Sequence, residues 1–88
     1  MNELSVFTAA IQKYGERAQE GIAQEECEEL TQAISKKHRG KPHNIPEEIA
    51  DVEIMLEQLK IINCCHYEVR KIREQKIKRL YERLCREV

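Results

Sequence analysis

The sequence predicts an all-α fold, a compact four-helix bundle forming one domain over residues 1–88 and completed by self-association. Of the 88 residues, 35% are charged and 5% aromatic, which suits a helical bundle better than a sheet protein. Apolar residues recur at three- and four-residue spacing, and glycine or proline separates most of these stretches. A chain this short buries little surface, so we expect a homodimer or homotetramer to complete its core.

The first two helices are expected over residues 2–14 and 16–38. The first carries its apolar residues at alternating three- and four-residue spacing and ends at Gly15; these residues are Leu4, Phe7, Ile11 and Tyr14. The second contains Gly21, which disfavours a helix by about 1 kcal/mol relative to Ala and marks a weak point.

The third helix is expected over residues 44–63, after a polar, basic loop. Asn44 can serve as its N-cap with Glu47 three residues on, and Pro46 is tolerated in the first turn. The fourth helix covers roughly residues 67–88. No glycine or proline lies in residues 62–67, so the sequence does not mark where the third helix ends.

Two acidic clusters lie on the second and third helices. At about 100° per residue, Glu26 falls inside the apolar arc of the second helix and Glu29 lies about 20° outside it. On the third helix Glu48 falls inside the apolar arc, and Asp51 lies about 20° beyond its edge. Each helix thus carries two acids at i,i+3 spacing beside its apolar face, and antiparallel packing would bring the two pairs together.

An ionised carboxylate stays in an apolar seam only where a cation compensates it. Four converging carboxylates suit a hard divalent ion such as Mg2+, which commonly holds substrate phosphates as well. We therefore predict a metal site at Glu26, Glu29, Glu48 and Asp51. The competing explanation is an internal ion pair of Glu48 or Glu26 with Lys76.

The last helix has the opposite charge to the rest of the chain. Residues 1–65 carry 7 Lys or Arg and 12 Asp or Glu, whereas residues 66–88 carry 8 and 4. Lys76 falls inside the apolar stripe of this helix and Arg79 about 20° outside it. Such a helix could clamp phosphate opposite a metal or bind nucleic acid. A second apolar strip on the third helix again indicates an oligomer interface: Ala50, Ile54 and Ile61.

The cysteines and the hydropathy predict a cytoplasmic protein with reduced thiols. The four cysteines show no disulfide framework, and neither a secretory signal nor a membrane-length apolar run is present. Cys64 and Cys65 lack the two-residue spacer of zinc sites, and no second ligand pair follows, so zinc is not expected there.

The acidic motifs resemble a known family signature. Glu25-Glu26-Cys27-Glu28-Glu29 followed by Glu48-Ile49-Ala50-Asp51 is similar to the Glu-Glu-x-x-Glu and Glu-x-x-Asp motifs of the MazG-like, all-α nucleoside triphosphate pyrophosphohydrolases. The resemblance covers about residues 18–84, and the compact length is typical of small single-domain members in phage and prophage genomes. Two positions depart from the pattern: Gln58 stands where members often have Asn, and Ile77 where they often have an aromatic residue.

The resemblance implies hydrolysis of NTP or dNTP to the monophosphate and pyrophosphate, by attack of a metal-activated water on the α-phosphorus. Mg2+, with Mn2+ as a possible substitute, would be held by the four predicted ligands. Glu25 would orient or deprotonate the water, and Lys76 and Arg79 would bind phosphate. Two alternatives stay open: a non-catalytic helical interaction or regulatory module, and a nucleic-acid binder that uses the basic last helix.

Overall fold

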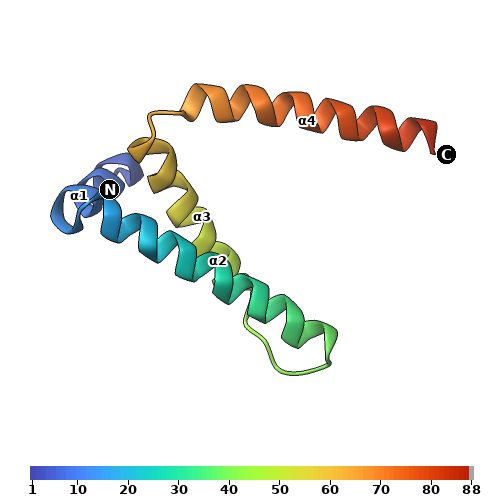
Figure 1. Ribbon diagram of the computed structural model, residues 1–88, viewed down its shortest axis with the longest axis horizontal. Coiled ribbons are helices and arrows are strands. Elements are labelled where there is room, and N and C mark those ends of the chain that lie inside the picture. Colours follow the sequence, from blue (N-terminus) through green and yellow to red (C-terminus); the bar gives the residue numbers. More distant parts are fainter. Residues whose placement is uncertain (88) are drawn as a thin grey trace.

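The computed structural model describes residues 1–87, and in this part of the chain it is entirely helical (Figure 1). The four helices are α1 (Glu3–Tyr14), α2 (Glu16–His38), α3 (Ile45–Ile62) and α4 (His66–Arg86). The prediction of an all-α chain with four helices is confirmed, with bounds close to those expected from the sequence; the expected end of the fourth helix at Val88 lies outside the described residues. None of the described helices is long and apolar enough to cross a membrane.

Local sequence explains where α1 begins and ends. The Ser5 amide donates to Oδ1 of Asn2 over 3.3 Å, so Asn2 caps the first turn. Gly15 ends the helix at φ 94°, and its amide donates to the carbonyl of Ile11 over 2.8 Å. A side chain at this φ would be strained, which explains the glycine. Gly21 does not interrupt α2, which continues unbroken to His38.

The centre of the fold is the hairpin of α2 and α3, which run antiparallel with α1 packed across one end (Figure 1). The buried side chains of α1, α2 and α3 are few and mostly small or polar: Ile11, Gln19, Ala23, Ala33, Glu48, Met55 and Gln58. The two alanines let the helix backbones approach closely. Three of these seven side chains are polar, so the seam between α2 and α3 also holds buried polar groups that need partners.

The fourth helix stands apart from this hairpin. It packs against α3 near their junction and projects beyond it (Figure 1). None of its described residues is buried. The Cα radius of gyration is 16.2 Å, against about 12 Å for a compact chain of this length. The four helices therefore do not close into a bundle within one chain, and completion by oligomerisation stays a prediction.

A Schellman motif separates α3 from α4. Cys64 has φ 51°, its amide donates to the carbonyl of Ile61 over 3.2 Å, and the Cys65 amide donates to the carbonyl of Lys60 over 3.1 Å. Glycine commonly occupies the left-handed position of this motif. Here it is a cysteine, which explains why the sequence showed no marker for the break.

Candidate metal centre

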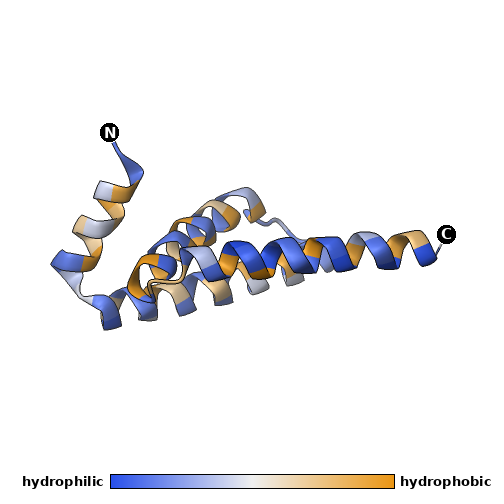
Figure 2. Cartoon of the chain, turned by 90° about the horizontal axis from the view of Figure 1, so that it is seen from above, coloured by the Kyte–Doolittle hydropathy of each residue, from blue (hydrophilic) through white to orange (hydrophobic). Residues whose placement is uncertain are grey.

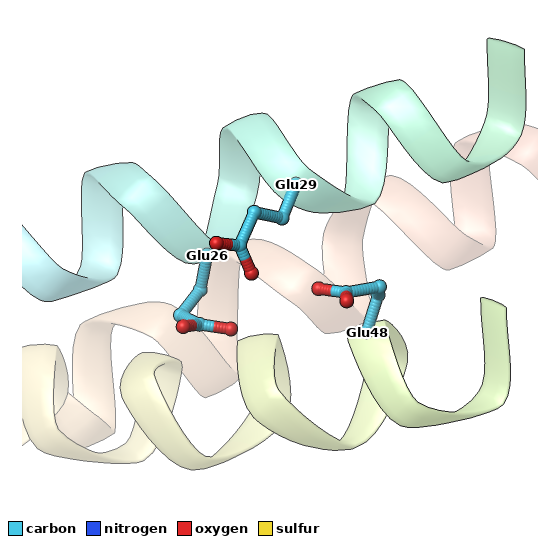
Figure 3. Close-up of side chains that lie close together, drawn as sticks. All are labelled: Glu26, Glu29 and Glu48. Carbon is cyan, nitrogen blue, oxygen red and sulfur yellow. The ribbon is translucent and has the colours of Figure 1, made fainter. Parts of the chain in front are cut away.

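Three of the four predicted ligands converge between α2 and α3. One carboxylate oxygen from each of Glu26, Glu29 and Glu48 lies within 4.8 Å of the other two (Figure 3). Asp51 adjoins this group, since its carboxylate influences the protonation of both Glu26 and Glu29. We call these four residues the acidic seam. The i,i+3 spacing on each helix and the antiparallel hairpin together place them there.

Two carboxylate oxygens of the acidic seam are buried without a partner. Glu48 is only 7% exposed, Glu26 is half-buried and Glu29 is exposed. Oε2 of Glu26 and Oε2 of Glu48 accept no hydrogen bond. Leaving a buried acceptor unpaired is unfavourable, and more so for a charged group. Each such oxygen in a native fold needs an explanation, and an ion is one of the few available.

The acidic groups also raise one another's affinity for protons. Partial burial, followed by repulsion from Glu29 and Asp51, raises the pKa of Glu26. Repulsion from Glu48, followed by partial desolvation, raises the pKa of Glu29. Both shifts show that the seam concentrates negative charge that no basic side chain offsets. Between pairs of described residues, the ion pairs are Glu57–Lys60 within α3 and Arg83–Glu87 at the end of α4.

The residues present fit a hard divalent cation. The donors are carboxylate oxygens alone, which is the chemistry that Mg2+ and Mn2+ prefer. Two of those oxygens are buried and unpartnered, and the converging donors come from two rigid helices. A cation there would satisfy the orphaned oxygens and remove the mutual repulsion in a single step.

Asn44 contributes to the site in a way that the sequence did not predict. It occupies the N-cap position of α3, but its side chain makes no capping hydrogen bond to the helix backbone. Its Nδ2 instead donates to Oε1 of Glu48 over 2.8 Å and to Oε2 of Glu47 over 3.2 Å. The N-cap reading is thus correct in position but wrong in its contact. The i,i+4 spacing of Asn44 and Glu48 was the available signal.

A pair of buried amides lies further along the interface between α2 and α3. Nε2 of Gln19 donates to Oε1 of Gln58 over 2.7 Å, and Nε2 of Gln58 contacts the sulfur of Met55 at 3.7 Å. Oε1 of Gln19 has no hydrogen-bond partner. Gln58 follows Asp51 by seven residues, about two turns, and so continues the same face of α3. Its amide therefore lies on the face of α3 that packs against α2, beside the acidic seam.

The remaining predicted site residues lie outside the cluster. Glu25 is exposed on α2, where its charge contributes to the raised pKa of Glu29. Lys76 and Arg79 are exposed on α4, which makes no contact with α2. Within one chain, neither basic residue forms an ion pair with Glu26 or Glu48, and neither is brought to the acidic seam.

Comparison with known proteins gives no match: no family model, no curated protein and no solved structure is similar to this chain at a significant level. The family assignment therefore stays a prediction that depends on the two acidic motifs.

Proposed function

We propose that this chain is a Mg2+-dependent nucleoside triphosphate pyrophosphohydrolase, which converts NTP or dNTP and water to the monophosphate and pyrophosphate. The observation that supports this most directly is the pair of buried, unpartnered oxygens on Glu26 and Glu48, inside a group of donors within 4.8 Å of one another. The signature-like spacing of the acids, Glu-Glu-x-x-Glu and Glu-x-x-Asp, adds the substrate class.

Each site residue has its own role in the proposed reaction. Glu26, Glu29, Glu48 and Asp51 hold the cation, and Asn44 fixes the carboxylate of Glu48. Bound Mg2+, or Mn2+ in its place, supplies charge neutralisation for the triphosphate and acidifies water. Glu25, exposed beside Glu29, accepts the proton as the water oxygen bonds to the α-phosphorus and the bond to the β-phosphate oxygen breaks. Lys76 and Arg79, which lie away from the seam within one chain, would offset the charge of the departing pyrophosphate once a second copy brings them there.

The second candidate function is nucleic-acid binding. It is favoured by α4, a helix with no buried residue among those described, whose segment, residues 66–88, carries 8 Lys or Arg against 4 Glu. This function predicts a steep loss of DNA affinity with rising salt and no release of pyrophosphate. It leaves the unpartnered oxygens of the acidic seam unexplained, so we rank it second.

A pyrophosphate-release screen over NTPs and dNTPs, with Mg2+ or Mn2+, tests the proposal. We expect turnover by the natural chain and a loss of at least about 100-fold in Glu48→Gln, because one metal-bound charge is removed. Helical content, measured by circular dichroism, should be retained. Glu28→Gln is the matched control, since Glu28 lies exposed on the same helix. A folded natural chain that releases no pyrophosphate from any nucleotide would refute the proposed function.

A further inference from the structure

The apolar stripe of α4 is uncovered in a single chain. We use the name α4 stripe for Val69, Ile72, Ile77, Leu80 and Leu84, with Lys76 among them. Ile77 is 50% exposed and Leu84 is 55% exposed. Val69, Ile72, Lys76 and Leu80 line one shallow groove along the helix. Figure 2 shows apolar residues recurring along α4 between polar ones. An amphipathic helix of this kind normally buries its apolar stripe against another surface.

The surface area of the chain indicates how much is left uncovered. The accessible surface is 7276 Å2, whereas a compact chain of 10.4 kDa exposes about 5400 Å2. The excess of roughly 1900 Å2 per chain is the area that each partner buries in an obligate homodimer. A second copy of this chain is therefore an occupant of adequate size for the uncovered surface.

The α4 helix does not reach the acidic seam of its own chain. Val69 and Arg73 lie over a groove lined on α3 by Glu53, Glu57 and Lys60. Each of those three residues follows one of Asp51, Met55 and Gln58 by two positions. The two sets therefore lie about 200° apart around α3. The start of α4 is thus on the side of α3 that faces away from α2. The hydrogen-bonded turn at Cys64 holds it in that direction.

An exposed apolar residue borders the acidic seam. Ile22 precedes Glu26 by one turn on α2 and is 39% exposed. The α4 stripe presents Lys76 between Ile72 and Leu80. The negative charge of the seam and the positive charge of Lys76, each beside exposed apolar side chains, make the two surfaces complementary.

We propose that α4 of a second copy lies across the α2–α3 pair and brings its Lys76 and Arg79 to the acidic seam, so that two chains exchange these helices and build each site together. The exchange is reciprocal, as two-fold symmetry requires, and each copy covers the stripe of the other. The phosphate-binding role of Lys76 rests on the proposed function, whereas the exchange of α4 between copies does not.

Oligomeric state provides the first test. Light scattering on the full chain should give a dimer or a larger even-numbered assembly, and Leu80→Glu should convert it to monomers. Gln75→Glu is the matched control, because Gln75 is exposed about 140° around the helix from Leu80. A natural chain that is monomeric at all concentrations overturns the inference, as does an unchanged assembly in a folded Leu80→Glu chain.

Cross-linking tests the contact without requiring turnover. A 1:1 mixture of unlabelled and 15N-labelled chains is dissociated, allowed to reassociate and treated with a carbodiimide, which joins a lysine amine directly to a carboxylate. We expect peptides containing Lys76 to be joined to peptides of the acidic seam in mixed-isotope products, and Lys76→Ala to remove them. Products of a single isotope composition, or none involving the seam, overturn the inference. The cross-linking result tests the contact even if the chain releases no pyrophosphate.

Complementation tests whether the shared site is functional. Chains with Glu48→Gln and chains with Lys76→Ala, each impaired alone, are mixed after reversible dissociation. Each mixed dimer contains one intact site, so the mixture should recover about one quarter of natural activity per chain. Glu48→Gln mixed with Glu26→Gln is the control, because both lesions lie on the hairpin and no site becomes intact. Absence of rescue in the first mixture contradicts the exchange.

Discussion

Nδ2 of Asn44 donates a hydrogen bond of 2.8 Å to Oε1 of Glu48, and the other oxygen of that carboxylate lies buried and unpaired. The bond therefore decides which oxygen remains available within the acidic seam. Fixing one oxygen of a carboxylate so that the other is presented to an ion is how outer residues tune metal sites. Asn44 connects the basic loop to the seam by this single contact.

Replacing Asn44 tests that contact. Asn44→Ala should weaken binding of Mn2+ by roughly 10- to 100-fold, since the Glu48 carboxylate loses its orienting donor. Titration calorimetry with Mn2+ measures this directly. Asn63→Ala is the matched control, because the Asn63 side chain donates to the carbonyl of Leu59 at the far end of α3. Equal affinities in the natural chain and Asn44→Ala would show that the hydrogen bond does not position a ligand.

The raised pKa values of Glu26 and Glu29 predict how stability depends on pH when no metal is bound. Both lie above their ordinary value of 4.5, so the folded state binds protons more readily than the unfolded state. Their contribution to the free energy of unfolding is therefore complete below pH 4.5 and disappears as pH rises through the raised values. Saturating Mg2+ should restore stability at pH values above the raised pKa values of Glu26 and Glu29.

Unfolding in urea at a series of pH values, with EDTA or with Mg2+, measures this effect. Glu26→Gln in EDTA should lose less stability than the natural chain as pH rises, because one repelled carboxylate is gone. Glu28→Gln should behave as the natural chain does. Parallel pH profiles for the natural chain and Glu26→Gln would contradict the assignment of the shift to the seam.

The buried amide pair predicts a coupling energy between Gln19 and Gln58. Gln58→Leu should destabilise the fold by about 1–3 kcal/mol, because Nε2 of Gln19 is left buried without an acceptor. The double variant with Gln19→Leu should cost less than the sum of the single changes. Urea unfolding at one fixed chain concentration provides all four free energies. Strict additivity would mean that the two amides do not depend on each other.

The sequence was sufficient to predict the helices and the convergence of Glu26, Glu29 and Glu48. It was insufficient to predict the hydrogen-bond partner of Glu48 or the direction of α4. Periodic apolar residues and Gly15 give the bounds of α1 and α2, and i,i+3 spacing gives the shared face of Glu26 and Glu29. The contact of Asn44 with Glu48 depends on a side-chain torsion at a helix start, which periodicity does not encode. The direction of α4 depends on the backbone of Cys64, a residue type that rarely marks a helix end.

The backbone conformation of Cys64 gives a further prediction. Cys64 adopts φ 51°, where an L side chain costs roughly 1–2 kcal/mol relative to the right-handed region. Cys64→Gly should relieve much of that cost and raise the stability of the fold by about 1 kcal/mol. Cys65→Gly serves as the comparison, because Cys65 has φ −123° and gains nothing from glycine. Thermal melts that rank the two variants in the opposite order would exclude the explanation.

The sparse interior of the hairpin has a consequence at the level of the cell. The buried apolar side chains of the hairpin and α1 are Ile11, Ala23, Ala33 and Met55, a small set for the 87 described residues. Where copies supply one another's missing interior, folding and encounter become one concentration-dependent equilibrium. Near the midpoint of that equilibrium, halving the supply of chains removes more than half of the working sites. Expression level would then act as a nonlinear control on output, with no separate regulator.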